Sequence, residues 1–375
     1  MGWFDARRLC GLGIVVAGAT AGCATGADSP GSQTGETDEQ TTASSTPTSS
    51  QTTTSGPCDL STLSPGRDTP MFLEWEGVQR RYVLHVPADY DCTPRPVVMG
   101  IHGYYGSGEG FENSTAQMFD HLEANGYIGV FPDGLPAGDT GYLSLVTSFN
   151  DLTSRYDDGP DGPTCTANAW QYPAYDNCGP DEVGRACRWG TSCADDAGFF
   201  RAILAETQAT LTVDANRIYM TGFSQGGQTV QGLACELADV LAAIAPVHGF
   251  AANGWTCAPQ TPLPMLQIWG ESDSTVDGNT EASSDGMIYD GAEETAAEWA
   301  TQQGCDAAGD TPYPTVADGQ ADWTCNQHAN CAGGSEVVTC SWNGSHWWPR
   351  NGTYGNMGLD VIWDFFTKHE RTDQP

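Results

Sequence analysis

Basic side chains are scarce in this chain of 375 residues, which has 14 lysines and arginines against 48 aspartates and glutamates. The formal net charge of −34 is spread along the chain without an acidic block. A nucleic-acid partner requires a cationic surface that displaces counterions from phosphates, so we expect none. An internal repeat and a second hydropathic unit are also lacking, which favours a single folded domain.

Long apolar runs are lacking too. The run from Leu9 to Ala21 follows two arginines and is too short to span a bilayer as a mature helix, so it indicates an export signal in residues 1–23. The ending Thr20-Ala21-Gly22-Cys23 resembles a bacterial lipobox. We therefore expect lipidation at Cys23 as the one membrane attachment, with plain secretion as the alternative.

The next segment, residues 24–57, has almost no apolar side chains and is rich in Thr, Ser and Gly. Such a segment cannot bury enough surface to offset its ordering entropy, and we predict a disordered linker. Residues 58–375 are then the folded domain of a protein displayed at the bacterial cell surface or secreted, and we expect it to be a monomer.

Of the 14 cysteines, all but Cys10 and Cys23 lie between Cys58 and Cys340. An even number downstream of an export signal predicts disulfides and not metal ligation. Proximity along the chain suggests the pairs Cys187–Cys193, Cys235–Cys257 and Cys325–Cys331. The run Cys325-x-x-His328-x-x-Cys331 has zinc-like spacing, but in an exported chain a disulfide beside a bystander histidine is favoured.

Short apolar runs, most of them β-branched and ended by glycine, alternate with helical patterns. This alternation predicts βαβ units and a doubly wound, mostly parallel sheet with helices on both faces. The predicted strands lie within 80–87, 95–103, 127–134, 217–222, 242–249, 264–270 and 336–344. The predicted helices are Ala194–Leu211, Gly226–Leu241, Ala292–Gln303 and Met357–His369.

Two stretches break the alternation. Leu135 to Cys193 is long, rich in Gly, Asp and Pro, and carries seven aromatic residues that include Trp170 and Trp189. A loop of this length in a compact domain is functional or stapled, so we interpret it as a disulfide-pinned cap whose aromatics line a substrate cleft. The alternative is a small satellite core. Cys305 to Gly334 is a second, smaller insertion.

The run Gly222-Phe223-Ser224-Gln225-Gly226 matches the G-x-S-x-G elbow, which places a nucleophilic serine between a strand and a helix. A plausible strand precedes it and a plausible helix follows, so we predict an α/β hydrolase with Ser224 as nucleophile. The alternative is an ordinary glycine-rich turn.

In this fold the acid and the base follow the serine in chain order. The candidate bases are His248, His328, His346 and His369, and position favours His346, in a loop after an apolar run and before the last helix. Asp273 and Asp277 are the candidate acids, and Asp273 is nearer a strand end. The same loop imitates part of a calcium site but lacks the glutamate at its twelfth position.

The oxyanion hole requires backbone N–H groups near the nucleophile. We expect them from Gln225 and from Tyr104, in the glycine-rich loop from His102 to Gly108. Catalysis of this kind requires neither a metal nor a cofactor. We also expect Trp347 and Trp348, which follow the base, to bind substrate.

The runs "HGYYGSG", "FPDG", "DDAGFFRAILA", "IYMTGFSQGG", "GESD" and "GSHWWP", in that order, resemble the landmarks of the secreted esterase family that joins feruloyl esterases with polyhydroxybutyrate depolymerases. The resemblance covers about Arg80 to the C-terminus. It implies Ser224, Asp273 and His346 as the catalytic residues. It also implies a Cys235–Cys257 disulfide and favours Cys305–Cys340.

The sequence departs from the family at Trp269, where a histidine is usual, and at Arg350, where a glycine is usual. The function implied is an exported carboxylic ester hydrolase acting on a feruloyl or acetyl group of plant cell-wall xylan. A polyhydroxybutyrate depolymerase is the alternative within the family. A non-catalytic polysaccharide-binding surface lipoprotein is the alternative of another class.

Overall fold

The structure, a computed structural model, describes residues 57–137, 146–179, 186–259, 261–279, 281–320, 322–350 and 355–371. The predicted export signal, the lipid site at Cys23 and the linker up to residue 56 lie outside the described residues. The described residues all belong to one compact unit. Among them no helix is long and apolar enough to cross a membrane.

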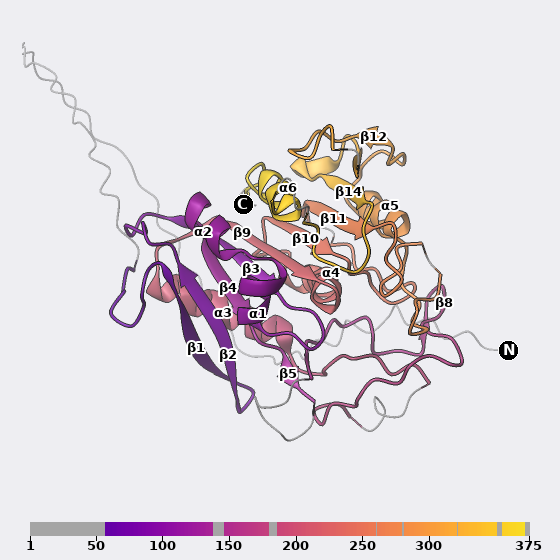
Figure 1. Cartoon of the computed structure of the whole chain (residues 1–375), viewed down its shortest axis with the longest axis horizontal. Coiled ribbons are helices and arrows are strands. Elements are labelled where there is room, and N and C mark those ends of the chain that lie inside the picture. Colours follow the sequence, from indigo (N-terminus) through magenta and orange to yellow (C-terminus); the bar gives the residue numbers. More distant parts are fainter. Residues whose placement is uncertain are drawn as a thin grey trace, which may run out of the picture. The chain divides into compact units, whose positions relative to one another are not determined.

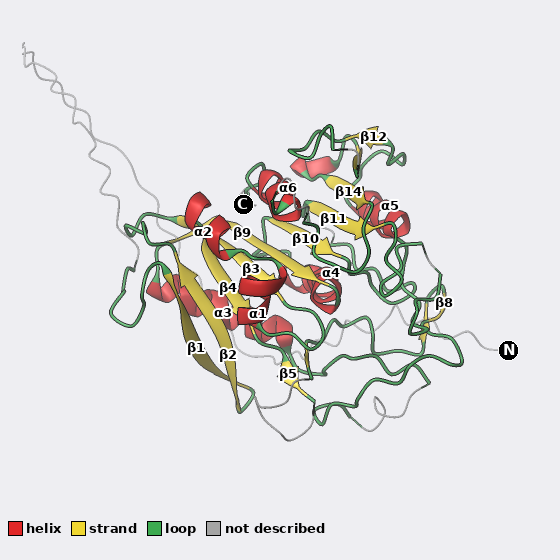
Figure 2. Ribbon diagram, viewed as in Figure 1, coloured by secondary structure: helices red, strands yellow, loops and turns green. Residues whose placement is uncertain are grey.

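A 10-stranded sheet runs through this unit (Figures 1 and 2). Its strands in spatial order are β1 (Arg67–Trp75), β2 (Val78–Val86), β4 (Ile128–Pro132), β3 (Arg95–Ile101), β9 (Val213–Phe223), β10 (Ala243–Val247), β11 (Met265–Gly270), β14 (Val337–Trp342), β13 (Trp323–His328) and β12 (Thr311–Pro312). The central strands from β4 to β14 are parallel, and antiparallel strands flank them at both edges. The predicted mostly parallel sheet is confirmed.

Helices cover both faces of the sheet (Figure 2). On one face α3 (Asp196–Thr210), α4 (Gln225–Leu237) and α5 (Ala292–Gln302) pack in one apolar cluster. On the other face the π-helix η1 (Phe111–Thr115), α2 (Phe119–Asn125) and α6 (Met357–Phe366) pack in a second cluster. Strand β3 supplies Val97 and Met99 to the first and Val98 to the second, as the alternation of side chains along a strand requires.

Three strands of the 10-stranded sheet were not predicted from the sequence. Strand β1 lies at an edge, and its alternating exposure leaves no continuous apolar run to detect. Strands β12 and β13 belong to the second insertion, Cys305 to Gly334, which also holds the short 3-10 helix η3 (Ala332–Gly334). That insertion therefore extends the sheet instead of forming a separate loop.

Six disulfides join the twelve cysteines downstream of residue 57: Cys58–Cys92, Cys165–Cys187, Cys178–Cys193, Cys235–Cys257, Cys305–Cys331 and Cys325–Cys340. Of the predicted pairs, Cys235–Cys257 is confirmed. The pairs Cys187–Cys193, Cys325–Cys331 and Cys305–Cys340 are wrong.

The sheet register explains two of these errors. Cys325 and Cys340 lie directly opposite each other on the antiparallel strands β13 and β14, so their side chains meet on one face. This leaves Cys331, at the start of η3, to pair with Cys305 after α5. In the first insertion each cysteine pairs across a longer segment than the predicted Cys187–Cys193 pair would span. Cys187 pairs with Cys165, and the Asp157 side chain, which accepts the Cys187 N–H at 2.9 Å, helps to hold Cys187 in place.

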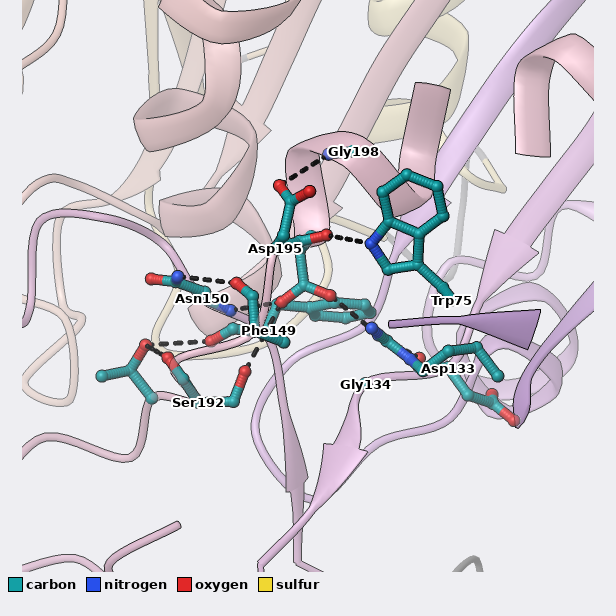
Figure 3. A network of polar contacts seen from close by, with 12 residues as sticks. Trp75, Asp133, Gly134, Phe149, Asn150, Ser192, Asp195 and Gly198 are labelled. Carbon is teal, nitrogen blue, oxygen red and sulfur yellow. Dashed lines mark hydrogen bonds and ion pairs between the residues drawn. The ribbon is translucent and has the colours of Figure 1, made fainter. Parts of the chain in front are cut away.

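The first insertion, Leu135 to Cys193, contains two small hairpins, β5–β6 (Leu135–Pro136, Thr147–Ser148) and β7–β8 (Asp158–Gly159, Gly162–Pro163). A buried polar network ties it to the start of α3 (Figure 3). The Asp196 carboxylate pairs with Arg80 at 2.7 Å and accepts the Asn150 N–H at 2.7 Å. Asn150 in turn donates to the Ala194 carbonyl at 2.7 Å. The segment beside Ser148 is therefore fixed against the main sheet.

Candidate active site

Ser224 lies at the sharp turn between β9 and α4, with φ of 58° and ψ of −126°. A non-glycine residue with positive φ at a strand-to-helix junction is the geometry of a nucleophile elbow. A Cβ at Gly222 would lie 2.5 Å from the Gly226 carbonyl oxygen, and one at Gly226 would clash with the Ile101 carbonyl. The glycines on both sides of Ser224 are therefore required by close backbone approach.

His346 and Asp273 complete a hydrogen-bonded line that begins at Ser224. His346 Nε2 is 2.8 Å from Ser224 Oγ, and His346 Nδ1 is 2.7 Å from Asp273 Oδ2. The Asp273 side chain is buried, and that of His346 is 19% exposed. The three residues that chain order selected are thus brought together in hydrogen-bond reach, from the ends of β9, β11 and β14.

Asp273 is placed by the turn after β11. Its Oδ1 accepts the N–H groups of Thr275 at 2.8 Å and Val276 at 3.1 Å, which leaves Oδ2 for histidine. The rival carboxylate, Asp277, accepts hydrogen bonds from Asn279 in its own turn. Of the two predicted candidates, Asp273 is the one in contact with His346.

His248 is a second histidine on the same carboxylate oxygen. Its Nδ1 lies 2.6 Å from Asp273 Oδ2, and its Nε2 accepts the indole N–H of Trp342 at 3.0 Å. Because an indole nitrogen only donates, the proton of His248 is on Nδ1 and points at Asp273. The oxygen Oδ2 therefore accepts two imidazole N–H groups.

Sequence reasoning considered His248 only as a base and passed over this role. A signal was present: His248 directly follows β10, and in a parallel sheet β10 lies between β9 and β11. The residue after its carboxyl end must therefore lie between the nucleophile and the acid. Its positive φ of 49° turns the chain at that point.

The ionisation of this cluster follows from burial and hydrogen bonding. Burial alone would raise the pKa of Asp273, but the hydrogen bonds from His248 and His346 outweigh it and hold that pKa well below its ordinary value. Burial lowers the pKa of His248, and the contact with Asp273 opposes the shift only in part. The cluster therefore holds a carboxylate anion beside a neutral His248.

The loop His102–Gly108 follows β3 and packs against the elbow. His102 Nε2 accepts the Gly134 N–H at 2.9 Å, so its Nδ1 carries the proton and donates to the Gly103 carbonyl at 2.8 Å. A Cβ at Gly103 would lie 3.1 Å from the Ser224 Cβ. This close approach brings the loop that carries Tyr104 to the nucleophile.

Gln225 is the first residue of α4, so its backbone N–H has no acceptor within the helix. Its side chain donates to the Phe149 carbonyl at 2.9 Å, which ties the nucleophile turn to the first insertion. Tyr104 and Gln225, the predicted oxyanion donors, both line the pocket that contains Ser224. The helix dipole also favours negative charge at this end of α4.

The pocket at Ser224 has a volume of about 240 Å³. It is lined by Tyr104, Tyr172, Trp189, Gly190, Ser224, Gln225, Gln228, Thr275, Val276, Asp285, Tyr289 and His346. Tyr172 and Trp189 come from the first insertion, so part of its aromatic set borders the pocket. Other aromatics pack elsewhere: Tyr156 stacks on Trp255, and Tyr175 is buried. Part of the insertion therefore lines the pocket, as the cap interpretation predicts, and part packs on itself and its neighbours, as the satellite-core interpretation predicts.

The predicted substrate residues Trp347 and Trp348 do not line this pocket. Trp348 is 4% exposed, its ring packs on Phe111, and its indole N–H donates to Asn356 at 2.8 Å. The Trp348 side chain therefore packs in the core against Phe111 and does not face this pocket, and its substrate contact stays a prediction. Trp347 is 72% exposed.

The other candidate histidines lie apart from Ser224. His328 is 3.1 Å from the Asp306 carbonyl, and His369 is 3.2 Å from Glu336. Cys325 and Cys331, flanking His328, belong to different disulfides, so they do not form a zinc site with it.

Comparisons with known proteins find relatives that are named as esterases. The chain is 30% identical over 245 residues to "Feruloyl esterase B" of Piromyces equi, covering 61% of this chain and 44% of that protein. It is 25% identical over 292 residues to "Probable feruloyl esterase C" of Aspergillus niger, covering 76% of this chain and 83% of that protein. The chain thus spans about half the length of the first relative and most of the second. No family model matches the chain.

Among solved structures, the acetyl xylan esterase from Aspergillus awamori superposes with a TM-score of 0.50 at 14% identity, over 80% of this chain and 99% of that one. At this identity the likeness concerns the fold alone. The fold is that of the α/β hydrolases, and both relatives carry the name of an esterase. Two relatives named feruloyl esterase are thus similar to this chain over 245 and 292 residues, in line with the family resemblance of its motifs.

Proposed function

We propose that this chain is an exported serine carboxylic ester hydrolase that cleaves feruloyl or acetyl esters of plant cell-wall xylan. The observation that carries the proposal is the hydrogen-bonded line from Ser224 through His346 to Asp273, at the mouth of an aromatic pocket. The names of the relatives supply the substrate class. A polyester or a peptide substrate finds no specific support in the pocket.

The first half of the reaction forms an acyl-serine. His346 Nε2 accepts the hydroxyl proton of Ser224 as Oγ attacks the ester carbonyl, and Asp273 holds the proton on Nδ1 so that Nε2 is free to accept. The protonated His346 then gives its proton to the leaving sugar oxygen. Asp273 stabilises the transient imidazolium without becoming protonated.

The carbonyl oxygen becomes negative in each tetrahedral intermediate. The backbone N–H groups of Gln225 and Tyr104 are the donors we assign to it, at the positive end of α4. In the second half, His346 removes a proton from water, the water oxygen attacks the acyl carbon, and Ser224 leaves with the proton returned by His346. The acid is released and the site is restored.

The pocket chemistry favours the feruloyl ester over the acetyl ester. Tyr172, Trp189 and Tyr289 line one cavity of about 240 Å³, and flat aromatic walls suit a planar aromatic acyl group. An acetyl group would leave most of that volume to water. The Tyr172 hydroxyl donates to Asp285 at 2.6 Å, which places a polar edge within the pocket.

The test is hydrolysis of methyl ferulate, acetylated xylan and a polyhydroxybutyrate film by the purified protein, with Ser224→Ala as control. We expect the highest kcat/KM on the ferulate ester and none above background for the variant. Preferential release of acid from the polyester film would identify a depolymerase. Binding to xylan without hydrolysis of any ester would identify a polysaccharide-binding protein.

The site of action is the second part of the proposal. Six disulfides fit a protein that folds in an oxidising compartment. We propose that the chain acts outside the cell, attached by a lipid at Cys23 or released. Mass spectrometry of the mature N-terminus is the test, with a diacylglyceryl-modified Cys23 as the expected species. A free N-terminus elsewhere would contradict the anchor.

A further inference from the structure

A second histidine–carboxylate group, the His85 cluster, lies apart from the residues of the Ser224 site and consists of Asp68, His85, Glu112 and Glu123. His85 Nδ1 is 2.8 Å from Asp68 Oδ1 and 3.3 Å from Glu112 Oε1. His85 Nε2 is 2.8 Å from Glu123 Oε1. One imidazole is thus faced by three carboxylates.

Four separate elements build this cluster. Asp68 and His85 are direct partners in the antiparallel pair of β1 and β2, so their side chains lie on one face of the sheet. Glu112 comes from the π-helix η1 and Glu123 from α2, which cover that face. Residues from three other elements thus converge on His85, whose ring also makes an edge contact with Phe119.

The charges in the cluster do not balance within the described part of the chain. His85 and Glu112 are both 0% exposed, and neither carboxylate oxygen of Glu112 has a hydrogen-bond partner there. Glu123 accepts the Ala88 N–H and Asp68 accepts the Asn113 amide, but these donors do not reach Glu112. A buried carboxylate without a donor is costly, so the cluster calls for a further cation.

The same side chains offer ligand atoms for a metal ion. In the tautomer of His85 that donates Nε2–H to Glu123, the lone pair of Nδ1 is free to bind a metal, with Asp68 at 2.8 Å and Glu112 at 3.3 Å from that nitrogen. The three ligand atoms lie within 4.8 Å of one another. Ligands at zinc distances of about 2.0–2.1 Å in a tetrahedron are roughly 3.3 Å apart, which the Glu112 contact with His85 matches at 3.3 Å and the Asp68 contact, at 2.8 Å, approaches within about 0.5 Å.

We propose that Asp68, His85 and Glu112 bind a divalent transition-metal ion, with zinc as the best match, and that Glu123 orients His85. A carboxylate on the outer nitrogen of a ligating histidine is the usual support of such sites. One nitrogen and two carboxylate oxygens suit zinc, whereas calcium takes oxygen ligands alone. The metal joins β1 and β2 to η1, the segment that follows the Tyr104 loop, and its role is structural.

Zinc binding to the full chain, first stripped with a chelator, tests the proposal by calorimetric titration and thermal melting. We expect one zinc equivalent at this site and a melting temperature a few degrees higher when free zinc is about 100 times Kd. Glu112→Gln removes a ligand charge without changing shape and should weaken zinc binding more than 100-fold. Glu123→Gln should weaken it by about 10- to 100-fold.

Two control variants locate the binding. Glu109→Gln makes the same change on an exposed carboxylate three residues away and should leave zinc affinity unchanged. His346→Ala disrupts the other histidine–carboxylate group, and this variant should still bind one zinc ion tightly at the His85 cluster. No zinc binding by the native chain, or equal binding in Glu112→Gln, would overturn the proposal. Tighter binding of calcium than of zinc would overturn the assignment of the metal.

Discussion

The Ser224 site and the His85 cluster are built from the same two kinds of side chain in opposite proportions. At the Ser224 site two imidazoles, His346 and His248, share the Asp273 oxygen Oδ2. In the His85 cluster one imidazole meets three carboxylates. Both groups are largely buried, so neither is neutralised by solvent.

The proportions decide the chemistry. One anion that accepts two imidazole N–H groups stays ionised while a proton moves between Ser224 and His346, which suits general-base catalysis. Several anions around one imidazole cannot be satisfied by a single proton, which suits a divalent cation. Single substitutions at the Ser224 site test this contrast between the two groups.

Loss of the nucleophile or of the base has the largest expected effect. Ser224→Ala and His346→Ala should each lower kcat by roughly 10⁴-fold or more, because the triad members act as a unit. The measurement is ester hydrolysis, with thermal melts to confirm folding. Full activity of folded Ser224→Ala would end the esterase proposal.

Loss of the acid should have the second largest effect on kcat. Asp273→Asn should lower kcat by roughly 10³- to 10⁴-fold, since an amide no longer fixes the tautomer of His346. Asp277→Asn is the matched control and should cost little, because Asp277 bonds within its own turn. A larger loss in Asp277→Asn would move the acid by four positions along the chain.

The order of strands along the chain explains why the parallel sheet and the residues at the ends of its strands could be predicted from the sequence. Buried parallel strands appear as continuous apolar runs, and the elbow, the acid loop and the late histidine follow their ends. Ser224, Asp273 and His346 were therefore predicted from the elbow motif, from chain order and position and from the family resemblance, and the structure brings them into hydrogen-bond reach.

Most of the disulfide pairing, the His85 cluster and the orientation of Trp348 could not be predicted, because they depend on contacts between distant segments. The pairing of Cys325 with Cys340 follows from strand register, which counting residues does not reveal. Glu112 and His85 come from separate elements whose spacing carries no motif. Trp348 differs from Trp347 only in which way it points, and that is set by packing against Phe111.

A smaller effect is expected at His248, which we assign as a positioning residue for Asp273. His248→Phe removes one N–H from Oδ2, and we expect kcat/KM to fall by about 10- to 100-fold, a range typical of outer-shell partners. With one donor fewer, Asp273 holds a proton on His346 more firmly. The acid limb of the kcat/KM profile should therefore move to higher pH.

The conservative variant separates positioning from packing. His248→Gln keeps an amide N–H in reach of Asp273 and should recover much of the activity and the original acid limb. If both variants lose equal activity with an unshifted pH profile, His248 serves packing and not the carboxylate.

The smallest expected effect is on the pH dependence of stability. Burial lowers the pKa of His248 below its ordinary value, so below about pH 6.5 the unfolded chain binds a proton that the folded chain does not. Stability should therefore fall as pH falls from 7 to 5, with a contribution from His248 of at most about 1.4 kcal/mol per pH unit. His248→Gln has no group to titrate there, so its free energy of unfolding, measured in denaturant at each pH, should vary less than that of the native chain. An equal or steeper pH dependence in the variant would mean that His248 is protonated in the folded chain, and that Asp273 does not lie beside a neutral His248.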